Sequence, residues 1–150
     1  MKKFIFIIFL FLNACGYQSV NKIDKSNYNI SKYEFLGNQQ VNKILKKNFE
    51  RNKSNINFEK EFEIIATSNL VKSKKSKDKA GEATNLTLEI TVDLDIFQNG
   101  KKIKKMVINE NTNYNNNDNK FELKQFEKIL INDLVNKIIY RIDLNLSSIQ

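Results

Sequence analysis

The chain has 150 residues and a net charge of +8 at neutral pH, from 25 lysine and arginine residues against 17 aspartate and glutamate residues. The chain contains no histidine and one cysteine. This composition excludes disulfides within the chain, catalytic cysteine–histidine pairs, and metal sites built from histidine or several cysteines. We therefore expect no metal, no cofactor and no enzymatic activity.

The first 15 residues predict a bacterial lipoprotein export signal. Lys2 and Lys3 supply positive charge, residues 4–12 are apolar, and small residues lead up to Cys15. At about 1.5 Å per residue, this apolar stretch spans less than half of the roughly 30 Å hydrocarbon core, so it cannot cross a bilayer alone. We expect residues 1–14 to be cleaved and Cys15 to carry fatty acyl chains that anchor the protein in a membrane. The alternatives are an uncleaved anchor, or a secretory signal in which the cysteine follows the cut by chance.

The rest of the chain is expected to be a linker followed by one domain. Residues 15–27 are polar and lack hydrophobic periodicity, which is typical of a flexible tether between a lipid and a fold. Residues 28–150 have a length that suits one domain with a single core. The positive charge indicates an anionic partner. Because an exported chain rarely meets nucleic acid, we expect that partner to be lipid and not nucleic acid.

Three elements are predicted between residues 28 and 71. Residues 28–36 alternate enough for a first strand, which Gly37 ends. Asn38 can cap an amphipathic helix that runs to about residue 52. The apolar face of this helix consists of Val41, Ile44, Leu45 and Phe49. A second strand follows over residues 58–71, with apolar side chains on one side and glutamates on the other.

A hydrophilic run from Lys72 to Gly81 predicts a mobile loop after the second strand. Ammonium groups on such a loop can provide point charges for lipid phosphates without fixed geometry. The candidate residues for binding phosphorylated lipid are Lys72, Lys74, Lys75, Lys77 and Lys79. The alternative is a solvated loop whose charges only keep the neighbouring strand from aggregating.

The clearest strand covers residues 85–96, where polar and apolar side chains alternate without a break. One face of this strand is expected in the core and the other in water. Asn99 and Gly100 supply the two positive-φ positions of a type I′ turn. The sequence therefore predicts a hairpin at residues 96–103.

The register of this hairpin is open beyond its first pairs. Direct pairing across the turn sets Ile96 opposite Ile103. Past Val107, the same register would set Asn109 and Asn111 against apolar partners. We therefore expect either a bulge that shifts the pairing or a last strand that frays.

Two other charged groups lie near this hairpin. The first comprises Lys101, Lys102, Lys104 and Lys105. Lysine commonly protects an exposed sheet edge, and anion binding is the alternative role for this group. The second comprises Glu89, Asp93 and Asp95. These could be imagined as paired carboxylates of a glycosidase, but carboxylates on the wet side of a strand need no such role.

The chain ends in a long predicted helix. Asn119 and Glu122 have the spacing of a capping box at its start. The expected apolar face consists of Leu123, Phe126, Ile129, Leu130, Leu134, Val135, Ile138, Ile139 and Ile142. We expect Phe121 and Phe126 to belong to the core and not to a lipid tunnel.

The order of these elements predicts an α+β fold with the sequence strand, helix, three strands, helix. The economical arrangement is a four-stranded, mostly antiparallel sheet with two amphipathic helices packed on one face. The other face of such a sheet would stay open to partners.

This organisation resembles the lipopolysaccharide-assembly lipoprotein family LptE. The resemblance rests on the cleavage region before Cys15, the following Gly16 and Tyr17, the element order, and the step Tyr114-Asn115 before the last helix. It covers nearly all of the chain after the leader. The chain departs from the family in being short, in having no proline, and in its lysine- and asparagine-rich loops. The family's lipid-contacting residues therefore cannot be matched position by position.

The resemblance implies a non-catalytic lipoprotein of the Gram-negative outer membrane, facing the periplasm. It would sit as a plug inside the β-barrel translocon LptD, help that barrel to assemble, and contact lipopolysaccharide on its way to the cell surface. The residue after Cys15 is Gly16 and not aspartate. By the family's pattern, the chain therefore lacks the signal for retention in the inner membrane. The alternative function is a free-standing periplasmic lipid-binding lipoprotein that uses the same lysines without a barrel.

Overall fold

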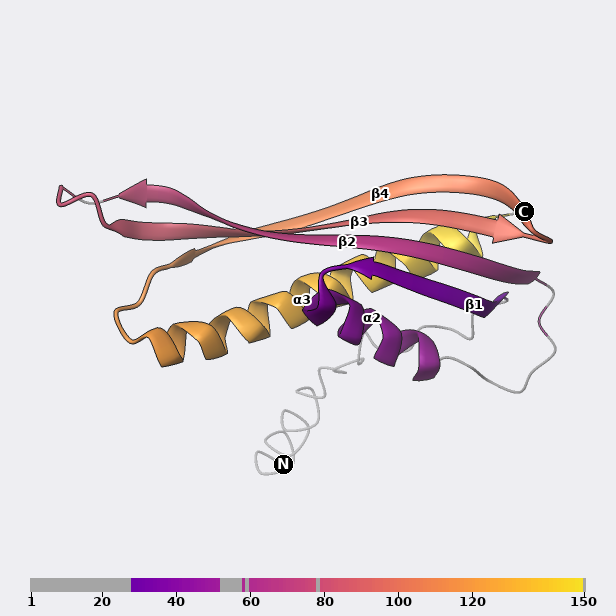
Figure 1. Ribbon diagram of the computed structural model, residues 1–150, viewed down its shortest axis with the longest axis horizontal. Helices are drawn as coiled ribbons and strands as arrows, with labels where there is room; N and C mark the ends of the chain where they lie inside the picture. The colour runs from indigo at the N-terminus through magenta and orange to yellow at the C-terminus, as the bar shows by residue number, and fades with distance from the viewer. Residues whose placement is uncertain (1–27, 52–57, 59, 78, 150) are drawn as a thin grey trace, which may run out of the picture.

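The computed structural model describes residues 28–51, 58, 60–77 and 79–149. Its elements are β1 (Tyr28–Gly37), α2 (Gln39–Arg51), β2 (Lys60–Lys77), β3 (Ala83–Gln98), β4 (Lys101–Asn115) and α3 (Lys120–Ser147). The strands form one sheet in the order β1-β2-β3-β4, with β1 and β2 parallel and the other pairs antiparallel. Both helices lie on the same face of the sheet (Figure 1). This confirms the predicted α+β architecture.

The core lies between the sheet and the inner sides of the two helices (Figure 1). Along β3, every second residue from Leu88 to Ile96 is buried and the residues between are partly exposed, as the alternating pattern predicts. The other large fully buried side chains are Leu45, Phe62, Ile64, Ile131, Leu134, Ile138, Ile142 and Leu146. Burial of each such side chain is worth about 1.5–3 kcal/mol, so this set holds the helices to the sheet.

Gly37 and Asn38 make the sharp turn from β1 into α2. Gly37 has a φ of +89°, and a Cβ at this position would lie 2.0 Å from the carbonyl oxygen of Ser68, so only glycine fits. The backbone nitrogen of Asn38 donates to that same oxygen at 3.0 Å. Asn38 Oδ1 accepts from the backbone nitrogens of Gln40 and Val41 at 3.0 and 3.1 Å. These bonds confirm the predicted helix cap.

The second strand is longer than predicted. β2 continues to Lys77 and pairs with β3 as far as Ala83, so the prediction of a loop beginning at Lys72 is wrong. The tertiary partner explains the difference, since β3 supplies hydrogen bonds along the whole run and overrides its weak strand propensity. β1 ends opposite Ser68. Beyond that point β2, β3 and β4 continue without β1 towards the far end of the sheet (Figure 1).

A bulge at Ile103 sets the register between β3 and β4. Phe97 pairs with Lys102 and Ile96 pairs with Lys104, which leaves Ile103 without a partner. The predicted pairing of Ile96 with Ile103 is therefore wrong, and the bulge alternative holds. Asn99 and Gly100 have the expected positive φ values of 53° and 72°, which confirms the turn. The one-residue shift sets Asn109 opposite Thr91 and Asn111 opposite Glu89, so both asparagines have polar partners.

Asn119 caps α3 as predicted. Its Oδ1 accepts from the backbone nitrogens of Phe121 and Glu122 at 3.1 and 3.3 Å. Glu122 does not complete a capping box, because its side chain accepts from Asn117 Nδ2 at 3.1 Å. The cap therefore consists only of the hydrogen bonds to Asn119 Oδ1. The Glu122 side chain bonds to the preceding loop and not back to the cap residue.

The predicted apolar face of α3 holds for the second half of the helix and only in part for the first, where Leu123 and Leu130 are half-buried against the core. Leu134, Val135, Ile138, Ile139 and Ile142 are all buried. In the first half the buried residues are Glu127 and Ile131, whereas the exposed apolar residues are Phe121 (71 % exposed), Phe126 (46 %) and Ile129 (58 %). Because the sheet twists, the side of a 28-residue helix that faces it changes along the helix.

Candidate functional site

The candidate site begins with the lysine segment, which we define as residues 72–79. Lys72 pairs with Leu88 and Lys74 with Leu86, so both side chains share the sheet face that bears the helices. Register shifts follow Lys74 and Ser76, and Ser76 Oγ lies 2.8 Å from Thr84 Oγ1. From Lys72 to Lys77 the segment is therefore the charged end of a paired strand, with a more defined geometry than the predicted loop.

Lys72 is already engaged within the fold. Its Nζ donates to Glu127 Oε2 of α3, and the other carboxylate oxygen of Glu127 accepts from the Tyr114 hydroxyl at 2.6 Å. Glu127 is buried, and Tyr114 is 5 % exposed. This cluster joins β2, β4 and α3. Of the five predicted lipid-binding lysines, Lys72 is thus the one with a structural role.

The electrostatics of this cluster follow from its contacts. Burial by itself raises the pKa of Glu127, but the hydrogen bonds from Lys72 and Tyr114 and the positive charge of Lys72 outweigh it and lower the pKa. Burial, the hydrogen bond to Glu127 and the negative charge of that carboxylate all raise the pKa of Tyr114. Glu127 is therefore a carboxylate and Tyr114 a neutral donor at neutral pH.

The other four candidate lysines are exposed and form no ion pair within the described residues. These are Lys74, Lys75, Lys77 and Lys79. Ammonium groups of this kind bind phosphate as compact point charges and keep a wide choice of geometry. The structure thus groups four available cations at one end of the sheet.

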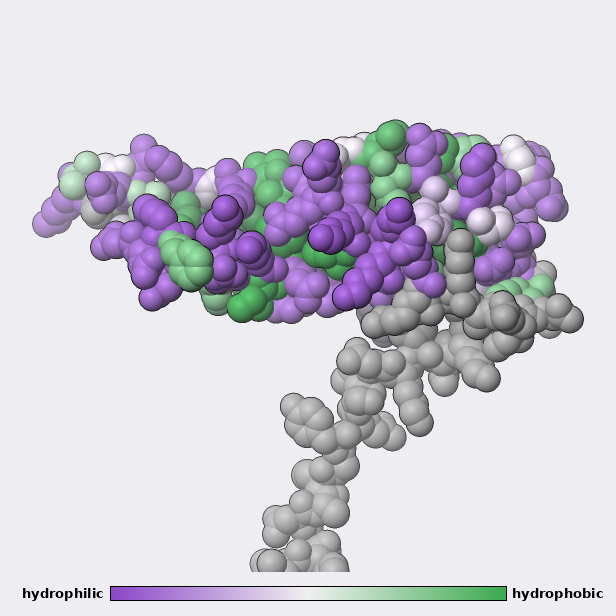
Figure 2. All heavy atoms as spheres, turned by 60° about the horizontal axis from the view of Figure 1, so that its bottom comes forward, coloured by the Kyte–Doolittle hydropathy of each residue, from purple (hydrophilic) through white to green (hydrophobic). Residues whose placement is uncertain are grey.

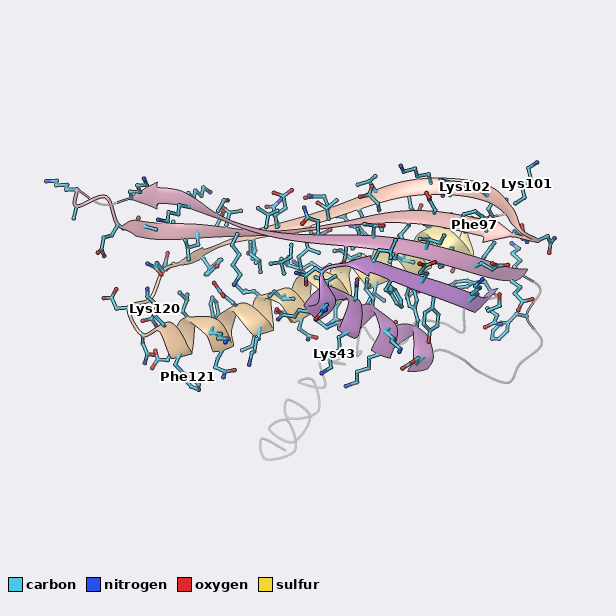
Figure 3. The ribbon with its side chains drawn as sticks, in the orientation of Figure 1. Lys43, Phe97, Lys101, Lys102, Lys120 and Phe121 are labelled. Carbon is cyan, nitrogen blue, oxygen red and sulfur yellow. The ribbon has the colours of Figure 1, made fainter. Side chains whose placement is uncertain are left out.

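The second basic group lies at the opposite end of the sheet, beside the β3–β4 turn (Figure 3). Lys102 Nζ forms an ion pair with Asp95 Oδ1 at 2.7 Å. Lys104 Nζ donates to Asn145 Oδ1 at 3.1 Å. The two lysine groups therefore do not form one site, and half of this second group is engaged in contacts within the fold.

The sheet face away from the helices, which we call the polar sheet face, carries side-chain hydrogen bonds between β3 and β4. Asn109 Nδ2 donates to Glu89 Oε1 at 2.5 Å and to Thr91 Oγ1 at 2.8 Å. Thr87 Oγ1 donates to Asn113 Oδ1 at 2.8 Å. Such pairs organise amide, hydroxyl and carboxylate groups on this face, which also exposes Val71 and Val107. Neither α2 nor α3 covers this face (Figure 1).

The acidic group considered for glycoside hydrolysis lies on the polar sheet face. Glu89 accepts a hydrogen bond from Asn109, and Asp95 is paired with Lys102. Both carboxylates are thus held in cross-strand contacts. Within the described ranges, no three cysteine, aspartate or glutamate residues gather closely enough to hold a metal ion.

The helix-side surface is mostly hydrophilic and carries separated hydrophobic patches (Figure 2). Phe121 and Lys120 extend from the first turn of α3, away from the sheet (Figure 3). Among the helices described, none combines the length and the apolarity needed to cross a bilayer. The predicted lipidation site Cys15 lies outside the described residues.

Glu127 is the residue that sequence reasoning missed. Because Glu127 is charged, it was not assigned to the apolar face of α3, although it lies four residues from both Leu123 and Ile131. Residues four apart share one face of a helix. A single acid on an otherwise apolar stripe was the available signal that this face contains a buried, partnered charge.

No protein-family model and no curated protein sequence matches the chain. Solved structures share its fold. Rare lipoprotein B of Shewanella oneidensis has a TM-score of 0.51 and 13% identity, over 77% of this chain and 98% of that chain. Lipoprotein B of Nitrosomonas europaea has a TM-score of 0.54 and 12% identity, over 82% and 89%. A minor lipoprotein of Acinetobacter baumannii has a TM-score of 0.52 and 18% identity, over 76% and 91%. The chain thus has the fold of these lipoprotein structures.

Proposed function

We propose that this protein is an outer-membrane lipoprotein, anchored through Cys15 and facing the periplasm. It acts as the plug and assembly partner of an LptD-like β-barrel in lipopolysaccharide transport to the cell surface. The export signal and the fold shared with lipoproteins support the anchoring. The protein works by shape and charge, and it catalyses no reaction.

The polar sheet face is the observation that carries the barrel partnership. The interior of an outer-membrane barrel is polar, and a plug must offer it hydrogen-bonding groups without large exposed apolar areas. Thr87, Glu89, Asn109 and Asn113 present such groups on a surface that no helix covers. We therefore assign this face to the barrel lumen.

Affinity purification of the lipidated protein from envelopes, followed by identification of bound proteins, tests the partnership. A large outer-membrane β-barrel is expected in stoichiometric amounts. The variant Asn111→Trp, which adds bulk to the polar sheet face, is expected to reduce this co-purification. Lys128→Trp on the exposed side of α3 is the matched control. Recovery of the protein without any barrel would overturn the proposal.

The four available lysines of the lysine segment are proposed to contact lipopolysaccharide phosphates. Glutamine at Lys74, Lys75, Lys77 and Lys79 is expected to weaken lipopolysaccharide binding and to reduce its dependence on salt. A control with the same loss of charge carries glutamine at Lys32, Lys43, Lys47 and Lys137, which are exposed on β1, α2 and α3 and belong to neither lysine group. Equal binding by both variants would remove the segment from the mechanism.

The alternative is a free-standing periplasmic lipid-binding lipoprotein, which the same exposed lysines would also serve. It predicts that the purified protein captures lipid with no barrel attached. Depletion separates the two functions, because loss of surface lipopolysaccharide is expected only for the barrel partner.

A further inference from the structure

A second stripe of side chains, which we call the outer seam, runs along α3 apart from the side that packs on the sheet. Its members are spaced alternately four and three residues apart, and they are Phe126, Leu130, Asp133, Lys137, Tyr140 and Leu144. This alternation is the spacing of the contact positions in a coiled coil. A second apolar stripe on a helix indicates a second packing partner.

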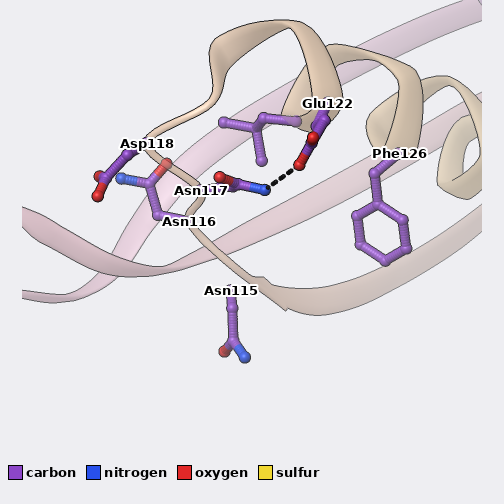
Figure 4. Close-up of a pocket in the computed structure, with 7 residues that line it drawn as sticks. Asn115, Asn116, Asn117, Asp118, Glu122 and Phe126 are labelled. Atoms are coloured by element: carbon purple, nitrogen blue, oxygen red, sulfur yellow. Dashed lines mark hydrogen bonds between the residues drawn. The ribbon is translucent and has the colours of Figure 1, made fainter.

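The apolar members of the outer seam remain accessible in the single chain. Tyr140 and Leu144 are 52 % and 53 % exposed, although both lie in the well-packed second half of α3. Phe126 borders a cavity of about 490 Å³ where β4 passes into α3 (Figure 4). Its ring lies near the Tyr114 ring, at a centroid distance of 6.3 Å, and Leu130 is half-buried against the core. Both ends of the seam therefore present apolar side chains to water.

The neighbouring elements contact other sides of α3. Asn132 and Asn136 line a gap of about 220 Å³ with residues of α2, and these two positions are turned by about 80–120° from the middle of the outer seam. Arg141 forms an ion pair with Glu110 of β4 at 2.8 Å. The outer seam lies between these two contact sides and faces away from the rest of the domain.

The middle of the outer seam contains two charged residues, Asp133 and Lys137, which are both exposed. Neither forms an ion pair with any described residue. A charge at a contact position weakens a coiled coil unless the partner supplies the opposite charge, so such a residue selects the partner and the register. The partner should therefore carry one acid and one base in the reverse order.

We propose that the outer seam pairs with the outer seam of a second copy of this chain, as an antiparallel two-helix coiled coil. A two-fold axis that passes the helices near residue 135 sets Asp133 of each copy opposite Lys137 of the other. A parallel pair would instead set acid against acid and base against base. The same axis joins the apolar members of the seam, pairing Phe126 with Leu144 and Leu130 with Tyr140.

This pairing goes beyond the proposed function and leaves the polar sheet face free, because α3 lies on the opposite side of the sheet (Figure 1). Residues 126–144 rise about 1.5 Å each, so the seam is about 27 Å long. Such a small interface implies a weak dimer, with a dissociation constant of about 1–100 μM. Lipopolysaccharide titrations at nanomolar protein report on the monomer, so the control that includes Lys137→Gln stays valid.

Sedimentation equilibrium of the full chain in density-matched detergent tests the pairing, and the wild type is expected to form dimers as concentration rises. Lys137→Asp sets acid against acid and is expected to raise the dissociation constant at least about tenfold. Adding Asp133→Lys to that variant restores opposite charges and is expected to return the constant to within about threefold of the wild type. The control Lys124→Asp makes the same charge change on an exposed part of α3 outside the seam and is expected to dimerise as the wild type does.

Crosslinking of full chains that carry Cys15→Ser determines the orientation. Phe126→Cys and Leu144→Cys chains are expected to form disulfide-linked dimers only when the two are mixed, because these positions meet between antiparallel copies. Disulfides within either chain alone would overturn the antiparallel arrangement. A wild type that stays monomeric up to about 1 mM, or equal dissociation constants for Lys137→Asp and Lys124→Asp, would overturn the dimer. Neither result depends on whether a barrel co-purifies.

Discussion

The hydroxyl of Tyr114 and the carboxylate of Glu127 lie 2.6 Å apart, and this contact ties the end of β4 to the first half of α3. Lys72 reaches the same carboxylate from β2. Three elements, β2, β4 and α3, therefore meet at one buried acid. The cluster replaces the apolar contacts that Phe126 and Ile129 were expected to provide.

Glu127→Ala is expected to lower the free energy of unfolding by about 1.5–3 kcal/mol, because it removes hydrogen bonds to a charged group and leaves the buried Tyr114 hydroxyl without a partner. Urea denaturation measures this change. The control is Lys46→Ala, which breaks the exposed i,i+4 pair with Glu50 and is expected to cost at most about 0.5 kcal/mol. Equal losses in the two variants would contradict a structural role for the cluster.

Asp143→Asn is expected to change how stability depends on pH. Burial raises the pKa of Asp143 above 3.8, although the hydrogen bond from the Tyr28 hydroxyl at 2.6 Å opposes the rise. The folded state then binds this proton more tightly than the unfolded state. The contribution is fully present below pH 3.8 and is lost as pH rises through the folded pKa. Unfolding free energies of both proteins across this window should show the decline only in the wild type.

Glu127 is expected to change the pH dependence of stability in the direction opposite to Asp143. Its pKa is lowered from 4.5, so its contribution is present above pH 4.5 and is lost as pH falls through the folded pKa. In Lys72→Gln the hydrogen bond and the charge that lower this pKa are gone. Acid unfolding of that variant should therefore begin at a higher pH than in the wild type, and an unchanged acid midpoint would contradict the pairing.

Gly37→Ala is expected to destabilise the fold more than the same change at Gly81. Both glycines have positive φ, at 89° and 85°, so alanine costs about 1–2 kcal/mol of backbone strain at either position. Only at Gly37 would the new Cβ also meet the Ser68 carbonyl oxygen, whereas nothing lies within 4 Å at Gly81. The difference in thermal stability between the two variants measures the cost of the clash with Ser68. Equal losses of stability would mean that the turn can shift away from that carbonyl oxygen.

Phe121→Ser is expected to change stability by no more than about 0.5 kcal/mol, because the ring is 71 % exposed. Ile131→Ala is expected to cost about 2–5 kcal/mol, because that side chain is 2 % exposed in the core. Denaturation of the pair checks which face of α3 contacts the sheet. A large loss in Phe121→Ser would support the predicted place of Phe121 in the core.

Local signals predicted this fold well. The caps at Asn38 and Asn119 and the turn at Asn99 and Gly100 depend on atoms within three residues, so residue type and spacing suffice to find them. The bulge at Ile103 was foreseen only as one of two alternatives, because local spacing shows a conflict without showing where the chain resolves it.

The candidate sites depended on contacts between distant parts of the chain. Lys72 and Glu127 are 55 residues apart, and neither spacing nor composition indicates that one neutralises the other. The loop after β4 likewise bonds to the start of β3, 33 residues earlier. Such contacts form only when the elements pack.

The amino-acid sequence by itself determined the element order, the helix caps, the hairpin turn and the alternating core face of β3, because these follow from short-range hydrogen bonding and from burial of regularly spaced apolar side chains. Tertiary structure alone decided that the chain from Lys72 to Lys77 is strand, that Glu127 is buried, and that Phe121 and Phe126 face outwards. The physical reason is that burial on a long helix depends on the twist of the sheet beneath it, and an extended polar run becomes a strand only when a partner strand accepts its hydrogen bonds.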